Sequence, residues 1–131
     1  MTTRQPIATD DAPGAVGPYS QAIRAGDLVF TAGQIGIDPA TGDLDGETAA
    51  DQARRALTNL AAILGAAGSG LDRLVKVTVF LVDIADWPPV NEVYAELVPE
   101  PFPARSAFAV KELPKGARVE IEAVALASNV G

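Results

Sequence analysis

Residues 48–68 carry the most constraining pattern in the sequence, because apolar residues recur there at intervals of three and four. This is the period of one face of an α-helix. Thr48, followed three positions later by Asp51, resembles a capping box, and Gly65 or Gly68 is suited to end the helix. A helix with a single apolar face has to pack against another layer of structure. The periodic positions are Ala49, Ala53, Ala56, Leu57, Leu60, Ile63, Leu64 and Ala67.

The residues before this helix predict a β-hairpin followed by a loop. Apolar-rich runs at 20–25 and 28–35 flank the dipeptide Gly26-Asp27, which suits a tight primed turn. Residues 36–47 are rich in Gly, Asp and Pro and have no periodicity, so they predict a loop. The acidic residues of this loop do not follow the Asp-x-Asp-x-Asp-Gly spacing common in Ca²⁺ sites, which favours a solvated turn.

The residues after the helix predict a strand, a second helix and two further strands. Residues 73–84 are β-branched and apolar nearly throughout, as in a central strand covered on both faces. Residues 86–98 predict a shorter helix in which Asp86 is a candidate cap and two prolines occupy the first turn. Two segments of alternating polarity finish the chain, at 104–113 and 117–126.

The order of these elements predicts an α+β fold with both helices on one face of a sheet. A chain of 131 residues is expected to form a single domain, spanning residues 1–131. The strands carry apolar residues at both odd and even positions, which point to opposite faces of the sheet. The face opposite the helices therefore also needs a cover. We therefore expect a homo-oligomer in which that face packs on another subunit.

The sequence contains no cysteine and no histidine, and these absences narrow its chemistry. Thiolate nucleophiles, imidazole bases, disulfides, iron–sulfur clusters and the usual zinc ligands are all excluded. Carboxylates, Arg, Lys, Tyr, hydroxyls and backbone groups are left, and any metal would be a hard cation bound by oxygen. We expect no metal and no organic cofactor.

The charge and the apolar pattern indicate a soluble protein. Ten Lys and Arg against 17 Asp and Glu give a net charge of −7, and the basic residues are scattered, which disfavours nucleic acids and anionic membranes as partners. No uncharged apolar run reaches the length of a membrane span, and the first residues lack the apolar region of a secretory signal. A cytoplasmic location is the expectation.

Charged residues within the last two predicted strands are the candidates for chemistry. Arg105 shares a strand face with Ala107 and Ala109, whose small side chains leave space beside the cation. A guanidinium matches a planar carboxylate through two parallel hydrogen bonds, so a small carboxylic acid is the natural ligand. Glu120 and Glu122 share one face of the last strand, and either can act as a base that activates water.

A purely structural explanation of these charges stays open. Arg105 and one glutamate can form a salt bridge on the sheet, or both glutamates can face water. If Lys115-Gly116 were a two-residue hairpin turn, the last two strands would pair directly. That register would place Arg105 opposite Leu126 and well apart from Glu120, so a direct contact would need another strand arrangement.

Four stretches resemble the RidA (YjgF-like) family of enamine/imine deaminases, nearly from end to end. They are IATDDAPGAVGPYSQAI, FTAGQIGIDPATG, VNEVYAEL and FPARSAFAVKELPKGARVEIEA. The last is the most specific, because it combines Pro-Ala-Arg-Ser with Leu-Pro and Glu-Ile-Glu-Ala. The resemblance implies a chorismate-mutase-like mixed sheet of about six strands with two helices on one face. It also implies a homotrimer with a central barrel and with clefts between its subunits.

The resemblance implies catalytic roles for two residues. Arg105 is similar in position to the family's carboxylate-binding arginine, and Glu120 to the residue that orients the attacking water and moves protons. This selects Glu120 over Glu122. The implied reaction is hydrolysis of 2-aminoacrylate and 2-aminocrotonate, through their imine tautomers, to ammonia and a 2-oxo acid.

The resemblance also implies residues that line the cleft. Backbone groups of Gly33 and Ala107 would hold the imine end of the substrate, while Tyr19 and Asn91 would form part of the wall. Taken without the resemblance, Tyr19 and Asn91 can equally be interface or capping residues. Ala107 stands where many members have Cys, and Ala32 where many have Ser, so substrate preference and rate are open.

The sequence is therefore compatible with three functions. The first is an imine deaminase that needs Arg105 and Glu120. The second is a regulator that binds a 2-oxo acid or another small carboxylate in the same cleft without turnover. The third is the ribonuclease or translation-inhibitor activity described for some relatives, which the net charge of −7 and the scattered basic residues disfavour.

Overall fold

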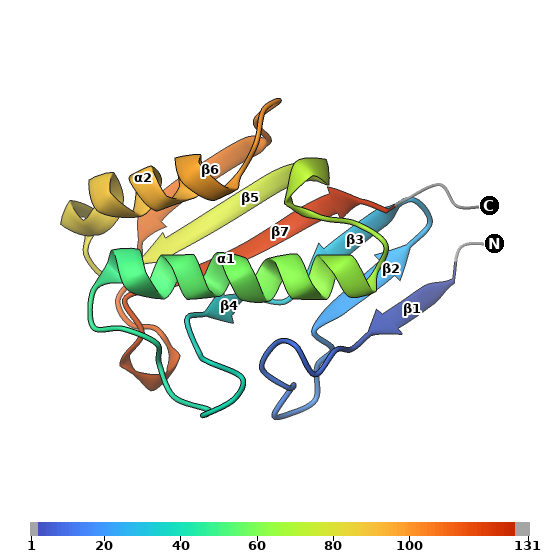
Figure 1. Cartoon of the computed structure of the whole chain (residues 1–131), viewed down its shortest axis with the longest axis horizontal. Helices are drawn as coiled ribbons and strands as arrows, with labels where there is room; N and C mark the ends of the chain where they lie inside the picture. The colour runs from blue at the N-terminus through green and yellow to red at the C-terminus, as the bar shows by residue number, and fades with distance from the viewer. Residues whose placement is uncertain (1–2, 128–131) are drawn as a thin grey trace.

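The computed structural model describes residues 3–127, which form one mixed β-sheet with two α-helices in front of it (Figure 1). The strand order is β1-β2-β3-β7-β5-β6, and β4 also pairs with β7. The pair β5–β6 is parallel and the other pairs are antiparallel. The expected α+β architecture is confirmed, with seven strands instead of about six. The bounds are β1 Arg4–Ile7, β2 Ala22–Ala25, β3 Leu28–Thr31, β4 Gln34–Ile35, β5 Leu74–Leu81, β6 Ala104–Ala109 and β7 Val119–Leu126.

The long helix α1 spans Ala49–Ala66, close to the predicted range. The Thr48 hydroxyl caps it by accepting a hydrogen bond from the Asp51 backbone N–H at 3.1 Å, as the sequence predicted. Gly68 follows the helix with a φ of +75°, a left-handed conformation that favours glycine at a helix end. The predicted apolar face of α1 is buried against the sheet, so burial of this face is what holds the helix in place.

The second helix, α2, spans Trp87–Leu97, and its prolines lie in the first turn as predicted. The interpretation of Asp86 as the cap is wrong, because its side chain makes no capping hydrogen bond. Asp86 instead lies 3.5 Å from Arg118 in an ion pair, measured from Oδ2 to Nη1. The capping contact lies one turn earlier, where Asp83 Oδ1 accepts from the Ala85 N–H at 2.9 Å.

The N-terminal hairpin forms as expected, but the predicted strand 28–35 is interrupted. Gly26 takes a φ of +60° in the tight turn between β2 and β3. The chain leaves the ladder at Ala32 and Gly33, and β4 then pairs with a different part of β7. The first strand, β1, was not predicted, and it pairs antiparallel with β2 at the sheet's edge.

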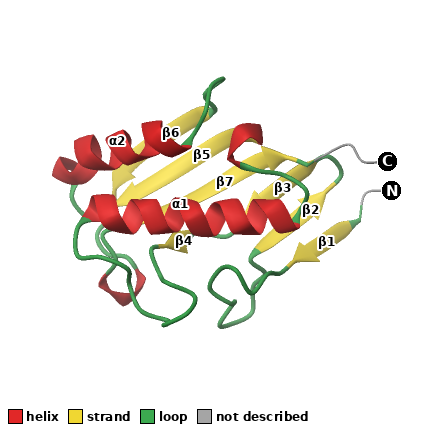
Figure 2. Cartoon of the chain, in the orientation of Figure 1, coloured by secondary structure: helices red, strands yellow, loops and turns green. Residues whose placement is uncertain are grey.

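The last two strands do not pair with each other, because β5 lies between them (Figure 2). The residues Lys115-Gly116 belong to a short 3-10 turn instead of a two-residue hairpin loop. Strand β5 is apolar along nearly its whole length and pairs along both edges, which is the central position predicted for it. The hairpin register considered for the last two strands is therefore wrong.

One face of the sheet is covered by the helices, and no helix of residues 3–127 covers the other. On the open face, Phe80 and Phe108 pack edge to face with ring centroids 5.3 Å apart. Phe30, Phe108 and Leu126 are each more than 40% exposed there. Exposed apolar patches of this kind are typical of subunit interfaces. The buried residues under the helices include Val77, Val79, Leu81, Val119, Ile121, Ala123 and Ala125.

No helix within residues 3–127 has the length and the apolar character needed to cross a membrane.

Candidate functional site

Arg105 projects from strand β6 toward helix α2. Its register partner on the parallel strand β5 is Val77, which is buried under the helices, so Arg105 points to the same face. Its Nη1 donates a hydrogen bond to Asn91 Oδ1 at 2.8 Å. Its Cζ lies 4.6 Å from the ring centroid of Trp87 and 4.7 Å from that of Tyr94. Among residues 3–127, the hydrogen bond and the two ring contacts of the guanidinium all come from helix α2.

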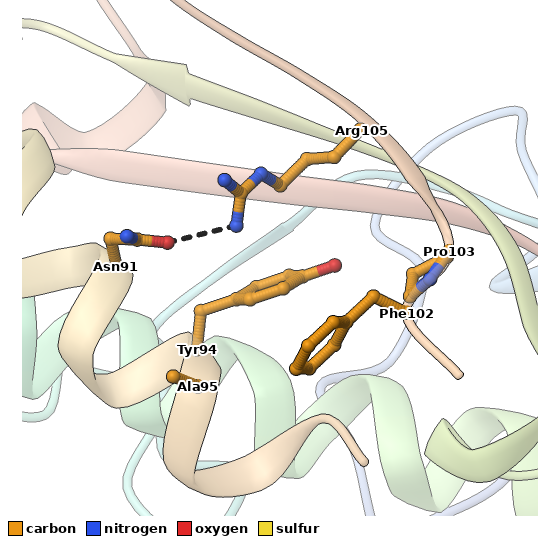
Figure 3. A pocket seen from close by; sticks show the side chains of 6 residues that line it. All are labelled: Asn91, Tyr94, Ala95, Phe102, Pro103 and Arg105. Atoms are coloured by element: carbon orange, nitrogen blue, oxygen red, sulfur yellow. Dashed lines mark hydrogen bonds between the residues drawn. The ribbon is translucent and has the colours of Figure 1, made fainter. Parts of the chain in front are cut away.

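A cavity of about 370 Å³ opens beside this guanidinium (Figure 3). Arg105 makes no ion pair with any acidic side chain of residues 3–127. The cation therefore faces a space of small-molecule size without a competing carboxylate, which suits an anionic ligand. The cavity is lined by Asn91, Tyr94, Ala95, Phe102, Pro103 and Arg105.

Glu120 projects from strand β7 to the open face of the sheet, opposite to the helices. It pairs with Phe80 on β5 and with Ile35 on β4, and its side chain is half-buried. Burial raises the pKa of the Glu120 carboxyl, and repulsion from Glu122 raises it further. A carboxyl whose pKa lies above its usual value is better matched to proton transfer near neutral pH.

Gly33 lies against this carboxyl. A Cβ placed on Gly33 would come within 2.8 Å of Glu120 Cδ, which is closer than real side chains approach one another. Gly33 occupies the gap between β3 and β4, where the chain has left the ladder. The absence of a side chain at this position therefore leaves room for the half-buried carboxyl.

A second cavity, of about 570 Å³, lies next to Glu120. It brings Tyr19 and Gly33 together with Glu120 and adds apolar residues and Lys115. Lys115 has a φ of +59°, which is uncommon for a residue other than glycine. The cavity is lined by Pro13, Gly14, Val16, Tyr19, Gly33, Gln34, Ile35, Ile37, Pro39, Gly42, Pro114, Lys115 and Glu120.

The candidate site residues are divided between these two cavities. Asn91 and Arg105 line the first cavity, whereas Tyr19, Gly33 and Glu120 line the second, and no residue lines both. Within a single chain, the predicted cation and the predicted base therefore belong to two separate half-sites.

Three further residues singled out in the sequence line neither cavity. Ala107 is half-buried and packs against the core beneath the helices. Glu122 is exposed and shares the open face with Glu120. Ala32 is half-buried between β3 and β4. Of the two glutamates between which strand parity left a choice, the one that lines a cavity is Glu120.

Sequence reasoning did not identify Trp87 and Tyr94 as part of the site. The signal was present in their spacing, because Trp87, Asn91 and Tyr94 stand at positions i, i+4 and i+7 of one helix. Burial raises the pKa of the Tyr94 phenol, with the charge of Arg105 opposing this shift, so the ring is neutral at neutral pH.

The loop that carries Tyr19 is anchored by a buried glutamine. Gln21 Oε1 accepts from the Thr9 N–H at 2.7 Å, and its Nε2 donates to the carbonyls of Thr9 at 3.1 Å and Pro13 at 2.7 Å. Pro13 lines the second cavity together with Tyr19. This amide therefore ties one wall of the cavity to the start of β2.

Among residues 3–127, no group of three or more Asp or Glu side chains is arranged to hold a metal ion. In the loop before α1, Asp45 and Asp38 lie near Arg55, at 2.8 Å and 3.9 Å, and form ion pairs with it.

The chain is similar to known proteins over nearly its whole length. Residues 9–127 match the model of a family described as Endoribonuclease L-PSP. The chain is 56% identical over 120 residues to a RutC family protein, y4sK, of Sinorhizobium fredii, covering 92% of this chain and 95% of that one. It is 49% identical over 123 residues to human 2-iminobutanoate/2-iminopropanoate deaminase, covering 94% and 90% of the two chains.

A solved structure of a RidA protein is similar to the chain over nearly its whole length. RidA from a Psychrobacter species superposes on the chain with a TM-score of 0.90 at 46% sequence identity, covering 94% of this chain and 99% of that one. The likeness extends over the sheet and both helices, and so includes the strands and the helix that position Arg105 and Glu120. The chain therefore belongs to the RidA (YjgF-like) family, whose model bears the description Endoribonuclease L-PSP.

Proposed function

We propose that this protein is an imine deaminase that hydrolyses 2-iminopropanoate and 2-iminobutanoate, the imine tautomers of 2-aminoacrylate and 2-aminocrotonate. The products are a 2-oxo acid and ammonia. The observation that carries this proposal is the pair of half-sites. One cavity lies beside Arg105, which has no acidic partner within residues 3–127, and the other lies beside Glu120, a half-buried glutamate with a raised pKa. The deaminase name of the human relative supports the same reaction.

The two half-sites require a second copy of the chain. Arg105 and Glu120 point to opposite faces of the sheet, so one chain cannot bring both to a small substrate. The exposed apolar residues of the open face provide a surface for packing against another subunit. We infer a homotrimer in which Arg105 of one subunit faces Glu120 of its neighbour, with the catalytic cleft between them.

In the assembled cleft, Arg105 binds the substrate carboxylate through N–H groups that Asn91 does not use. Glu120, in its ionised form, accepts a proton from a water molecule as the water oxygen bonds to the imine carbon. The proton taken by Glu120 passes to the imine nitrogen, which gives a carbinolamine. Glu120 then takes the proton of the new hydroxyl group and returns it to the amine nitrogen, so that the carbon–nitrogen bond breaks, ammonia leaves and the carbonyl of the 2-oxo acid forms. Backbone groups of Gly33 hold the imine end, and Tyr19 closes the wall on the Glu120 side. Ala107 lines neither cavity of the single chain, so its backbone takes part only if the open edge of β6 faces the cleft of the assembled protein.

This mechanism needs no metal and no organic cofactor. Imines hydrolyse in water without a catalyst, so positioning of the substrate and a placed base are sufficient sources of acceleration. General acid–base catalysis of the proton transfers contributes about 10²- to 10⁴-fold.

A coupled assay tests the proposal. A pyridoxal-phosphate-dependent dehydratase generates 2-aminoacrylate from serine, and the decay of the imine is followed with and without the protein. We expect faster decay with the wild type, and a large loss of this acceleration in both Arg105→Ala and Glu120→Gln. Wild-type protein without any acceleration, or full activity of Arg105→Ala, would contradict the proposal.

The same preparation separates the alternatives. Calorimetric binding of pyruvate without turnover would indicate the carboxylate-binding regulator. RNA cleavage that persists in an Arg105→Ala, Glu120→Ala double variant would come from a contaminating nuclease, since this variant lacks both candidate groups.

A further inference from the structure

Helix α2 presents one stripe of side chains to the guanidinium of Arg105. Trp87, Asn91 and Tyr94 stand at i, i+4 and i+7, and so lie on one face of the helix. All three touch the same group: Asn91 through a hydrogen bond of 2.8 Å, and the two rings with centroids 4.6 and 4.7 Å from Cζ. Figure 3 shows the Arg105 guanidinium above the Tyr94 ring, beside Asn91.

These contacts restrain the arginine without using most of its donors. A guanidinium carries five N–H groups, and the side chains of residues 3–127 engage it through a single hydrogen bond, to Asn91. The rings attract the cation through their π faces and accept no proton from its edge. A carboxylate in their place would restrain the arginine too, but it would occupy the edge and neutralise the charge that the substrate needs.

We propose that Trp87 and Tyr94 are positioning residues for the deaminase reaction. Together they hold the Arg105 guanidinium in place before the ligand binds, so that its unused N–H edge is directed at the carboxylate of a small 2-imino or 2-oxo acid. This inference rests on the proposed function and extends it to two residues that touch Arg105 and not the reacting atoms.

The physical basis of the proposal is preorganisation. A free arginine on a protein surface samples many rotamers and loses that freedom when it binds a ligand. Contacts that restrict the side chain beforehand remove part of this cost from the binding step. The gain is in affinity for the carboxylate, both in the substrate complex and in the transition state, so the loss of a ring is expected to raise KM more than it lowers kcat.

Calorimetry with pyruvate as the probe tests each ring. We expect Trp87→Leu and Tyr94→Leu each to weaken pyruvate binding by about tenfold, the scale of a partly desolvated cation–π contact, and to raise KM by a similar factor. Trp87→Phe and Tyr94→Phe keep an aromatic face under the guanidinium, so they are expected to bind pyruvate within about twofold of wild type. Tyr94→Phe removes only the hydroxyl and keeps the ring, so its comparison with Tyr94→Leu isolates the contribution of the aromatic face.

Val93→Ala is the matched control. Val93 is a buried core residue of the same helix, 6% exposed, so its truncation destabilises α2 without removing a contact of Arg105. We expect wild-type affinity for pyruvate in this variant. A loss equal to that of the leucine variants would assign the effect to helix stability and would overturn the positioning role.

The single tryptophan gives a second measurement on the unmodified protein. Because Trp87 lies against the guanidinium, pyruvate binding to Arg105 is expected to change its fluorescence, and Arg105→Ala is expected to abolish the change. If the leucine variants do not fold, this fluorescence titration of the wild type tests whether pyruvate binds at the guanidinium beside Trp87. A Trp87 signal that stays constant while calorimetry detects bound pyruvate would overturn the proposal.

The outcomes also separate this inference from the proposed function. Leucine variants that bind pyruvate as tightly as wild type overturn the positioning role, even if deaminase activity is established. Pyruvate binding without turnover in the wild type overturns the deaminase function. In that case the affinities of the leucine variants for pyruvate still test whether Trp87 and Tyr94 position Arg105. A wild type that neither binds pyruvate nor accelerates imine decay removes both.

Discussion

The side chains of Arg105 and Glu120 point to opposite faces of one β-sheet. Val77 on β5 is the register partner of both Arg105 on β6 and Ala123 on β7, so these three side chains share the face beneath the helices. Glu120 lies three residues before Ala123 on the same strand, and alternation therefore turns it to the open face. Within one chain, Arg105 and Glu120 therefore line different cavities.

This geometry predicts complementation between two inactive variants. Arg105→Ala and Glu120→Gln are each expected to be inactive alone, because every cleft lacks one of the two groups. In oligomers formed by refolding equal amounts together, about a quarter of the clefts would contain both native residues, given a closed ring with each site shared by two neighbours. We therefore expect about a quarter of wild-type deaminase activity in the mixture.

Mixing the folded variants without refolding is the control for complementation, since subunits that do not exchange cannot form mixed clefts. A refolded mixture as inactive as its components would contradict a site shared between subunits.

Gly33→Ala tests the close approach to Glu120. The added Cβ would lie 2.8 Å from Glu120 Cδ, so the flexible carboxylate is expected to move by a fraction of an ångström or more. Misplacement on this scale costs up to about 10²-fold in rate, and we expect kcat/KM to fall by that order. Gly65→Ala is the control, because its Cβ would meet nothing within 4 Å and it lies inside α1. Wild-type kinetics of Gly33→Ala would show that this approach does not position the carboxyl.

The raised pKa of Glu120 predicts a stability change in Glu120→Gln that depends on pH. The folded-state pKa lies above the unfolded value of 4.5, so the folded state binds the proton more tightly. The free energy of unfolding of the wild type therefore falls as pH rises through that window, and charged Glu120 costs stability at neutral pH. We expect Glu120→Gln to unfold at higher urea than wild type at pH 7, with the difference disappearing below pH 4.5.

Glu112→Gln provides the control for this measurement, because it removes one negative charge at an exposed position that lines neither cavity. An equal stabilisation by both variants at neutral pH would assign the effect to net charge instead of to the burial of Glu120.

Repulsion from Glu122, which contributes to the raised pKa of Glu120, predicts a shift in the pH profile of deaminase activity. Protonation of Glu120 removes the base, so kcat/KM is expected to fall in acid, around a pKa above 4.5. Glu122→Gln removes the repulsion from Glu122, which lowers the pKa of Glu120 and moves the acid limb of the profile to lower pH. An acid limb that stays in place in this variant would exclude Glu120 as the titrating group.

Gln21→Ala tests the anchor of the loop that carries Tyr19. The substitution leaves the Thr9 N–H and the carbonyls of Thr9 and Pro13 without their side-chain partner. We expect a loss of about 1–3 kcal/mol in the free energy of unfolding, and faster hydrogen exchange at the Thr9 amide. Gln5→Ala, at an exposed position on β1, is expected to change neither. Unchanged exchange at Thr9 would show that other contacts hold the loop.

Local patterns were sufficient to predict much of the fold. The three-and-four spacing of α1, its Thr48 cap and the apolar run of β5 are written in consecutive residues, and all three are confirmed. The Asp86 cap failed because its carboxylate pairs with Arg118, which is distant in the sequence. The two-residue turn considered at Lys115-Gly116 does not form, because turn propensity is local whereas strand order depends on which strand fills the centre of the sheet.

The sequence by itself determined the chemistry available to this protein and the candidate groups for it. Without histidine or cysteine, Arg105 and either Glu120 or Glu122 were the candidates for binding a carboxylate and activating water, and the family resemblance selected Glu120. The tertiary structure alone decided that Arg105 and Glu120 face opposite sides of the sheet, that Gly33 lies against Glu120, and that two aromatic rings contact Arg105. These relationships join residues far apart in the chain, and only the insertion of β5 between β6 and β7 and the packing of α2 bring them about.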